Sequence, residues 1–143
     1  MSTTKSKIAN GEFDSWDDES LRLEMIKLVR EGITYQDFLA FFRHNPFTDK
    51  EWSGYLGIST RTLDRYKLGQ KNFPAKQSER IIEIKRLMNY GISVFEDYAN
   101  FIAWMEASNI PLGGTSPKDI LDTTIGINMV NDQLGRIEHG ILA

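Results

Sequence analysis

Apolar residues recur along most of the chain with the three- and four-residue spacing of helices. Leu21, Met25 and Leu28 form the first such stripe, and Gly32 follows it. Residues at this spacing lie on one face of an amphipathic helix, and glycine is common just beyond a helix end. The pattern therefore predicts a helix over residues 16–31.

Two capping patterns mark the starts of the next helices. Thr34 with Asp37, and Thr48 with Glu51, each place a hydroxyl three residues before a carboxylate. At this spacing both side chains satisfy free backbone N–H groups of the first helical turn. Each pair precedes apolar positions that are predicted to face inward: Phe38, Phe41 and Phe42 after the first, and Trp52, Tyr55 and Leu56 after the second.

The stretch from Pro74 to Gly91 predicts a long helix with Ile81, Ile84 and Met88 on its apolar face. Because glycine disfavours a helix interior, this helix is expected to end at Gly91. Ser93 and Glu96 are then expected to cap a following helix. The apolar stripe predicted for that helix consists of Phe95, Tyr98, Ile102 and Met105.

The end of the chain predicts a loop, a short helix and a final long helix. The segment 111–117 is a loop by its proline and glycine content, and Ser116 is expected to cap a short helix that Pro117 opens. Gly113 or Gly114 is expected to adopt a positive φ in the turn before that cap. Gly126 is expected to interrupt the helices, and Gly140 to end the last one, whose inward positions are Val130, Leu134 and Ile137.

No stretch alternates apolar and polar residues with the period of a strand, so the fold is predicted to be all-α, with about seven or eight helices. The chain has 143 residues and no cysteine, which excludes disulfides, thiolate metal sites and a cysteine nucleophile. It also has neither an apolar segment long enough for a membrane nor a hydrophobic signal core, so a cytoplasmic location is expected.

Charge is distributed unevenly along the chain. Residues 61–90 hold eight basic and three acidic side chains, whereas residues 91–143 hold two basic and seven acidic ones. A basic middle segment suggests a surface that faces a polyanion, although a solvated helix face also requires charge. We therefore divide the chain into an N-terminal region, 1–90, and a C-terminal region, 91–143.

A helix-turn-helix is predicted over residues 48–68. Gly57 supplies a turn residue that tolerates positive φ, Ile58 fills the corner, and Ser59 caps the second helix, in which Leu63 and Tyr66 face inward. Such a second helix enters the major groove of DNA, where arginine pairs with guanine and lysines contact phosphates. The predicted DNA-binding residues are Thr60, Arg61, Thr62, Arg65, Lys67 and Lys71. The alternative is a helical corner within a bundle, and the basic excess that begins at Arg61 favours DNA binding.

Features that suggest an enzyme have simpler explanations. His44 and His139 lack metal ligands at a suitable spacing. The acidic run 17–19 suits the positive end of a helix dipole, and the segment 112–116 lacks the lysine of a phosphate-binding loop. We therefore predict no catalytic residue, metal, cofactor or small-molecule substrate. A small enzyme that uses the acidic run or the glycine loop is kept as an alternative.

Residues 45–143 resemble bacterial type II antitoxins with an Xre/MbcA/ParS-type toxin-binding domain, the partners of RES-domain toxins. The C-terminal resemblance rests on an ordered set of residues: Phe95-Glu96-Asp97, Ala103-Trp104, Asn109, Leu112-Gly113-Gly114, Ser116-Pro117, Leu121-Asp122-Thr123, Gly126, Val130, Leu134, Arg136-Ile137-Glu138 and Gly140. The upstream match consists of Ser59, Arg61-Thr62-Leu63, Arg65 and Ser78-Glu79-Arg80. Pro111 and His139 depart from the family's usual residues.

The resemblance implies an antitoxin that blocks the NAD-binding cleft of a RES toxin and represses its own operon by binding promoter DNA, as a homodimer. A short apolar tail after a helix stop is usually frayed and idle, and its insertion into a partner is the alternative that the resemblance favours. The residues implied in toxin binding are Arg136, Glu138, Gly140, Ile141, Leu142 and Ala143. The alternative is a stand-alone transcription regulator whose region 91–143 only dimerises.

Overall fold

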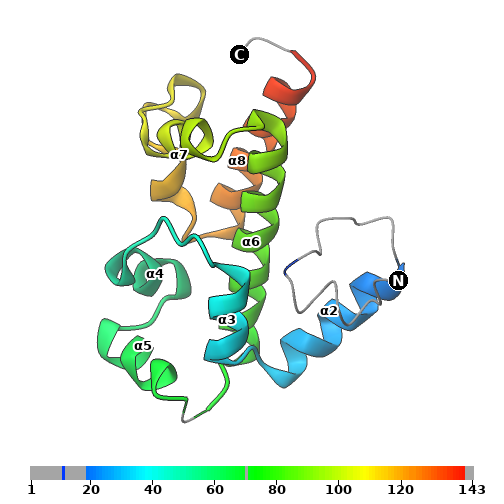
Figure 1. Ribbon diagram of the computed structural model, residues 1–143. Helices are drawn as coiled ribbons and strands as arrows, with labels where there is room; N and C mark the ends of the chain where they lie inside the picture. Colours follow the sequence, from blue (N-terminus) through cyan, green and yellow to red (C-terminus); the bar gives the residue numbers. More distant parts are fainter. Residues whose placement is uncertain (1–10, 12–18, 70, 141–143) are drawn as a thin grey trace. The chain divides into compact units, whose positions relative to one another are not determined.

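The computed structural model describes residues 11, 19–69 and 71–140, and every regular element within them is a helix (Figure 1). The predicted all-α class is therefore confirmed. The elements are α2 (Glu19–Glu31), α3 (Tyr35–Phe41), α4 (Asp49–Leu56), α5 (Thr60–Lys67), α6 (Ala75–Phe95), α7 (Tyr98–Glu106), the 3-10 helices η1 (Ile110–Leu112) and η2 (Pro117–Ile120), and α8 (Thr124–Glu138).

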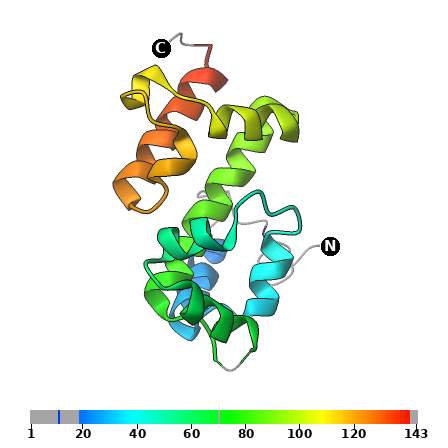
Figure 2. The same ribbon diagram turned by 90° about the vertical axis from the view of Figure 1, so that its left-hand side faces the viewer.

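The chain forms two compact units, and the boundary between them falls inside α6. The first unit ends at Lys85 and the second begins at Arg86. In the second unit, η1 and η2 lie beside α8, as both ribbon views show (Figures 1 and 2). None of the described helices is long and apolar enough to cross a membrane.

An aromatic cluster forms the core of the first unit. The ring of Trp52 is surrounded edge-on by those of Phe38, Phe42 and Phe47, with centroids 4.9, 4.7 and 5.5 Å away. Only 1% of the Trp52 surface is exposed, and its indole N–H donates to Asn45 Oδ1 at 2.9 Å. Burial on this scale, with the one polar atom satisfied, stabilises the fold strongly. The cluster confirms that Trp52 is a core residue.

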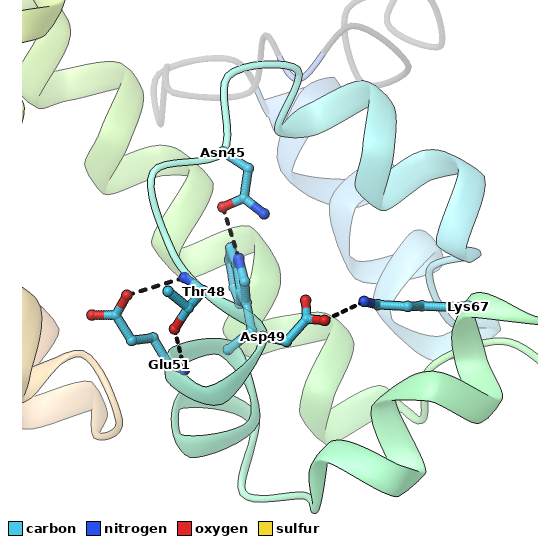
Figure 3. Close-up of polar contacts among 6 residues, drawn as sticks. Asn45, Thr48, Asp49, Glu51 and Lys67 are labelled. Carbon is cyan, nitrogen blue, oxygen red and sulfur yellow. Dashed lines mark hydrogen bonds and ion pairs between the residues drawn. The ribbon is translucent and has the colours of Figure 1, made fainter.

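The predicted caps of α3 and α4 are confirmed. The hydroxyl of Thr34 accepts from the N–H of Asp37, and the Asp37 carboxylate accepts from the N–H of Thr34. Thr48 and Glu51 form the same reciprocal pair at the start of α4 (Figure 3). Upstream, the predicted first helix is described from Glu19 onward, and its residues 16–18 lie outside the described part.

A polar junction ties the turn between α2 and α3 to the segment before α6. The buried Ser78 hydroxyl accepts from the N–H of Ile33 at 2.8 Å and donates to Phe73 O at 3.1 Å. The N–H of Phe73 in turn donates to Ile33 O at 2.8 Å. Gly32 has a φ of +90°, and a Cβ there would lie 2.4 Å from Phe73 O. The junction therefore requires glycine at this turn.

The predicted end of the long helix at Gly91 is wrong, because α6 continues to Phe95. Gly91 lies in the helix, where the ring of Phe101 packs directly against its backbone. A Cβ at Gly91 would lie 2.1 Å from Phe101 Cζ. Gly91 thus allows α7 to pack closely against α6, and it does not end the helix.

The predicted cap of the next helix is also wrong, and its predicted stripe is confirmed only at Met105. Because α6 includes Ser93, the N-cap of α7 is Asp97, whose carboxylate accepts from the N–H of Asn100 at 2.9 Å. The buried face of α7 consists of Phe101 and Met105. Phe95, Tyr98 and Ile102 are all at least partly exposed.

Gly126 does not interrupt the chain but lies in the first turn of α8. A Cβ there would lie 1.8 Å from Ile120 O, so the glycine lets α8 pack against η2. The buried face of α8 contains Ile127, Val130 and Leu134. Ile137 is 41% exposed, so its predicted inward position is wrong. It lies in the last turn of α8, beyond the buried part of the stripe.

The loop before η2 is partly as predicted. Gly113 and Gly114 have φ values of +75° and +87°, which confirms the expected left-handed turn. Ser116 occupies the N-cap position, but its side chain makes no capping hydrogen bond. The reason is that the N–H of Asp119 donates to the backbone oxygen of Ser116, as a 3-10 turn requires.

Candidate functional site

Helices α4 and α5 form a helix-turn-helix with a three-residue turn. Gly57 adopts the left-handed conformation with φ of 65°, and the N–H of Ile58 donates to Ser53 O at 3.0 Å. Ser59 then caps α5, since its hydroxyl accepts from the N–H of Thr62 at 3.0 Å. Every turn residue therefore has the conformation or the hydrogen bond that its position demands.

The inner face of α5 fixes which side chains point outward. Leu63 and Tyr66 are buried as predicted, and the Tyr66 ring stacks on Phe73 with centroids 4.6 Å apart. Four of the remaining side chains are exposed on the outer face: Thr60, Arg61, Asp64 and Arg65. This face presents two guanidinium groups that have the hydrogen-bond geometry for guanine edges in a major groove.

Two other predicted DNA-binding residues make contacts within the protein. Thr62 is half-buried, and its hydroxyl accepts from Ser59 Oγ at 3.0 Å. Lys71 is exposed, and its Nζ lies 5.6 Å from the centre of the Tyr66 ring. A cation over an aromatic face is held in place but keeps its charge. Lys71 therefore retains a positive charge beside the end of α5, whereas the Thr62 hydroxyl completes the cap.

Lys67 is paired with a carboxylate from the other helix. Its Nζ donates to Asp49 Oδ2, which belongs to the first residue of α4 (Figure 3). The hydrogen bond with Asp49 raises the pKa of Lys67 above the ordinary lysine value. The Lys67 ammonium is thus charged at neutral pH. Lys67 is the one predicted DNA-binding residue in the described part of the chain whose charge is matched by an ion-pair partner.

The end of α8 carries the described part of the second predicted site. Arg136, Glu138 and Gly140 are exposed there, whereas Ile141, Leu142 and Ala143 lie outside the described residues. Glu138 Oε1 accepts from the Tyr90 hydroxyl at 3.0 Å, which connects α8 to the end of α6. Burial, and then this hydrogen bond, raise the pKa of Tyr90. The contact holds the end of α8 in place.

The described residues contain no cluster suited to a metal ion, meaning three or more His, Cys, Asp or Glu side chains close together. His139 Nε2 lies 3.7 Å from Glu138 Oε1 on the surface. In the acidic run, Glu19 opens α2, while Asp17 and Asp18 lie outside the described part. The glycine loop is a tight turn in which Gly114 N–H donates to Asn109 O at 2.9 Å.

Two family models match the chain in succession. The antitoxin Xre-like helix-turn-helix domain matches residues 24–85, which include both helices of the motif. The antitoxin Xre/MbcA/ParS C-terminal toxin-binding domain matches residues 91–140. The matched residues together make up well over half of the chain. The toxin-binding model lies where the sequence shows the resemblance, whereas the helix-turn-helix model begins at residue 24, upstream of the predicted start at residue 45.

Curated proteins with antitoxin names are similar to the chain. Two proteins named "Antitoxin Xre", from Yersinia enterocolitica and Photorhabdus laumondii, are each 35% identical over 88 residues, which is 61% of this chain and 60% of the relative. The chain thus spans about 60% of the length of these relatives. The "Prs ADP-ribosylating antitoxin" of Sphingobium sp. is 22% identical over 130 residues, 85% of this chain and 82% of that protein. The resemblance in the sequence is therefore confirmed, and the chain belongs to the family of Xre/MbcA/ParS-type antitoxins.

Proposed function

We propose that the chain is the antitoxin of a type II toxin–antitoxin pair, and that it neutralises a RES-type, NAD-consuming toxin and represses its own operon. The observation that carries the proposal is the succession of the two family domains along one chain. In this proposal residues 1–90 form the DNA-binding part and residues 91–143 the toxin-binding part. NAD is the substrate of the toxin and not a cofactor of this chain.

In the toxin-binding part, the tail Gly140-Ile141-Leu142-Ala143 that follows α8 enters the toxin's cleft and blocks access of NAD. Arg136 and Glu138 flank this segment. The exposure of Arg136, Ile137 and Gly140 supports the proposal, because these residues are available to a partner. The hydrogen bond between Tyr90 and Glu138 supports it further, since it holds the helix from which the segment departs.

In the DNA-binding part, α5 enters the major groove of the operon's promoter. Arg61 and Arg65 read bases, Thr60 and Thr62 contact bases or phosphates, and Lys71 binds a phosphate. The exposure of both arginines and the buried inner face of α5 support this assignment. A homodimer would place two such helices on half-sites one turn of DNA apart.

Co-purification with the neighbouring gene product tests the toxin half of the proposal. The chain is expressed with that gene under its native promoter and isolated through an affinity tag on the antitoxin. We expect a stable complex in which NAD consumption by the partner is suppressed. A lone homodimer that binds no product of the neighbouring gene would contradict the antitoxin function and favour a stand-alone transcription regulator.

Promoter binding tests the DNA half. Arg61→Ala and Arg65→Ala should each weaken binding to the operator by about 1–3 kcal/mol if they read bases. Lys71→Ala should weaken binding to all sequences equally and lower the salt slope by about one. Lys27→Ala, at an exposed position of α2, serves as a matched control that leaves both quantities unchanged. The absence of salt-dependent binding by the unmodified chain would make the motif a structural corner only.

A further inference from the structure

We infer that Lys67 is a positioning residue that braces the helix-turn-helix through Asp49 and does not neutralise a DNA phosphate. The inference rests on the proposed DNA-binding function and changes the role that the sequence predicts for Lys67. It assigns the phosphate contacts near the end of α5 to Lys71. It also gives Asp49, which no sequence motif marks as functional, a role in orienting the recognition helix.

The positions of the two residues in the motif carry the inference. Gly57 to Ser59 join the C-terminal end of α4 to the N-terminal end of α5. Asp49 is the first residue of α4, and Lys67 is the last residue of α5. Their ion pair therefore connects the two ends that the turn leaves apart (Figure 3). Each helix has eight residues, so each arm of the motif is about 12 Å long.

Two arms joined at both ends have a fixed crossing angle. With the turn alone, only side-chain packing determines that angle. A change in the angle moves the far ends of the two helices the most, so the ion pair between those ends opposes it. The crossing angle determines how α5 enters a groove while α4 lies across the backbone. Loss of the pair should therefore affect discrimination between DNA sequences more than it affects folding.

The charges around the pair weaken the attraction of Lys67 for a DNA phosphate. Because Lys67 is held at Asp49, a phosphate that binds its remaining N–H donors would lie beside the Asp49 carboxylate, whose negative charge repels it. The side chains of Lys67 and Asp49 are 30% and 56% exposed, so the contact lies at the surface but is partly covered. Arg61 and Arg65, by contrast, form no ion pair within the described part of the chain. These two arginines can therefore bind DNA without disturbing the ion pair of Asp49.

The double variant Asp49→Asn with Lys67→Met separates the two roles. It removes both charges, keeps the net charge of the chain, and retains the aliphatic stem of Lys67. Binding of each chain is measured from low to moderate KCl concentration on two duplexes of equal length, the operon's own promoter and a scrambled sequence. Lys71→Met serves as the control for loss of a phosphate contact.

The double variant should keep the salt slope of the unmodified chain. Its preference for the promoter over the scrambled duplex should fall by about three- to ten-fold, because a misplaced α5 loses part of the discrimination that a base contact provides. The Lys71→Met control should lower the slope by about 0.9. A double variant whose slope falls like that of the control, with its preference intact, would overturn the inference. An unmodified chain without salt-dependent binding would overturn the proposed DNA-binding function itself.

Urea unfolding gives a readout that does not depend on DNA. The unmodified chain, the two single variants and the double variant form a double-mutant cycle. We expect the change in the unfolding equilibrium constant of the double variant to differ by about two- to five-fold from the product of the two single-variant changes, as measured for surface ion pairs of good geometry. Strictly additive single effects would show that the two side chains do not brace the helices.

Discussion

Both units cap the starts of helices, but they differ in where a neighbouring segment meets the backbone of a glycine. In the first unit, side chains cap α3, α4 and α5, and the closely contacted Gly32 lies in the turn between α2 and α3. In the second unit, Gly91 and Gly126 lie within α6 and α8, and they let neighbouring segments approach the helix backbones closely. A lost cap leaves one backbone group to water, whereas a side chain added at a close contact must displace the neighbouring segment. The second unit should therefore tolerate small changes at its junctions less well.

The largest effect should come from Gly126→Ala. The new Cβ would lie 1.8 Å from Ile120 O, so α8 and η2 would have to separate. Overpacking against a backbone atom costs about 3 kcal/mol or more of unfolding free energy, which urea denaturation measures. Gly135→Ala is the control on the same helix, because its Cβ would have an ordinary 3.6 Å contact with the Tyr90 hydroxyl. That variant should be stabilised by about 0.5–1 kcal/mol. Equal stability of the two variants would contradict the role given to Gly126.

A smaller effect should follow from valine at either glycine of the loop before η2. Gly113 and Gly114 have positive φ values, and no heavy atom outside the adjacent residues lies within 4 Å of a Cβ placed on either. The cost is thus conformational strain alone, about 1–3 kcal/mol for each variant. Thermal unfolding measures it, with Gly54→Ala in α4 as a control that has neither contact nor positive φ. Unchanged melting temperatures for both valine variants would show that neither position imposes strain on a side chain.

Loss of a cap in the first unit should cost less than either change. Thr48→Ala removes the hydroxyl that accepts from the N–H of Glu51 and should lower stability by about 1 kcal/mol. Thr48→Ser keeps the hydroxyl and should preserve most of that stability. Urea denaturation of both variants measures the difference. A loss as large as that of Gly126→Ala would contradict the proposed difference between the two units.

The smallest predicted effect is a gain. Glu96 has a φ of 58°, which makes it the one described non-glycine residue in the left-handed region. Glu96→Gly should remove this strain and raise stability by about 0.5–1 kcal/mol. Glu79→Gly, at an exposed position of α6, should instead lower it by about 1 kcal/mol. A melting temperature of Glu96→Gly below that of the natural chain would show that the glutamate side chain makes a compensating contact.

The same contrast explains how far the fold is predictable from the sequence. A cap joins residues three positions apart, so Thr34, Thr48 and Ser59 mark helix starts that the structure reproduces. Gly91 and Gly126 are explained by Phe101 and Ile120, whose proximity depends on the tertiary fold. The residues next to Gly91 and Gly126 in sequence predict a helix break at each glycine, and both predictions are wrong.

The candidate DNA-binding site shows the same division. The turn, the cap and the buried side of α5 follow from residues close together in sequence, and all of them are predicted. The partner of Lys67 is Asp49, 18 positions away, and the sequence contains no local sign of their contact. The hydroxyl of Ser78 likewise joins Ile33 across 45 positions. Long-range polar contacts of this kind become visible only in the folded chain.

NAD consumption by the co-purified toxin tests the proposed function most directly. The full chain is compared with a variant that lacks Ile141 to Ala143 and with Leu134→Asp, which places an unpaired charge at a fully buried position of α8. We expect the full chain to suppress NAD consumption, and the truncated chain to bind the toxin but to lose most of its inhibition. Leu134→Asp should lose both binding and inhibition because the second unit unfolds. Full inhibition by the truncated chain would contradict occlusion by this segment, and NAD consumption unaffected by the full chain would contradict the antitoxin function.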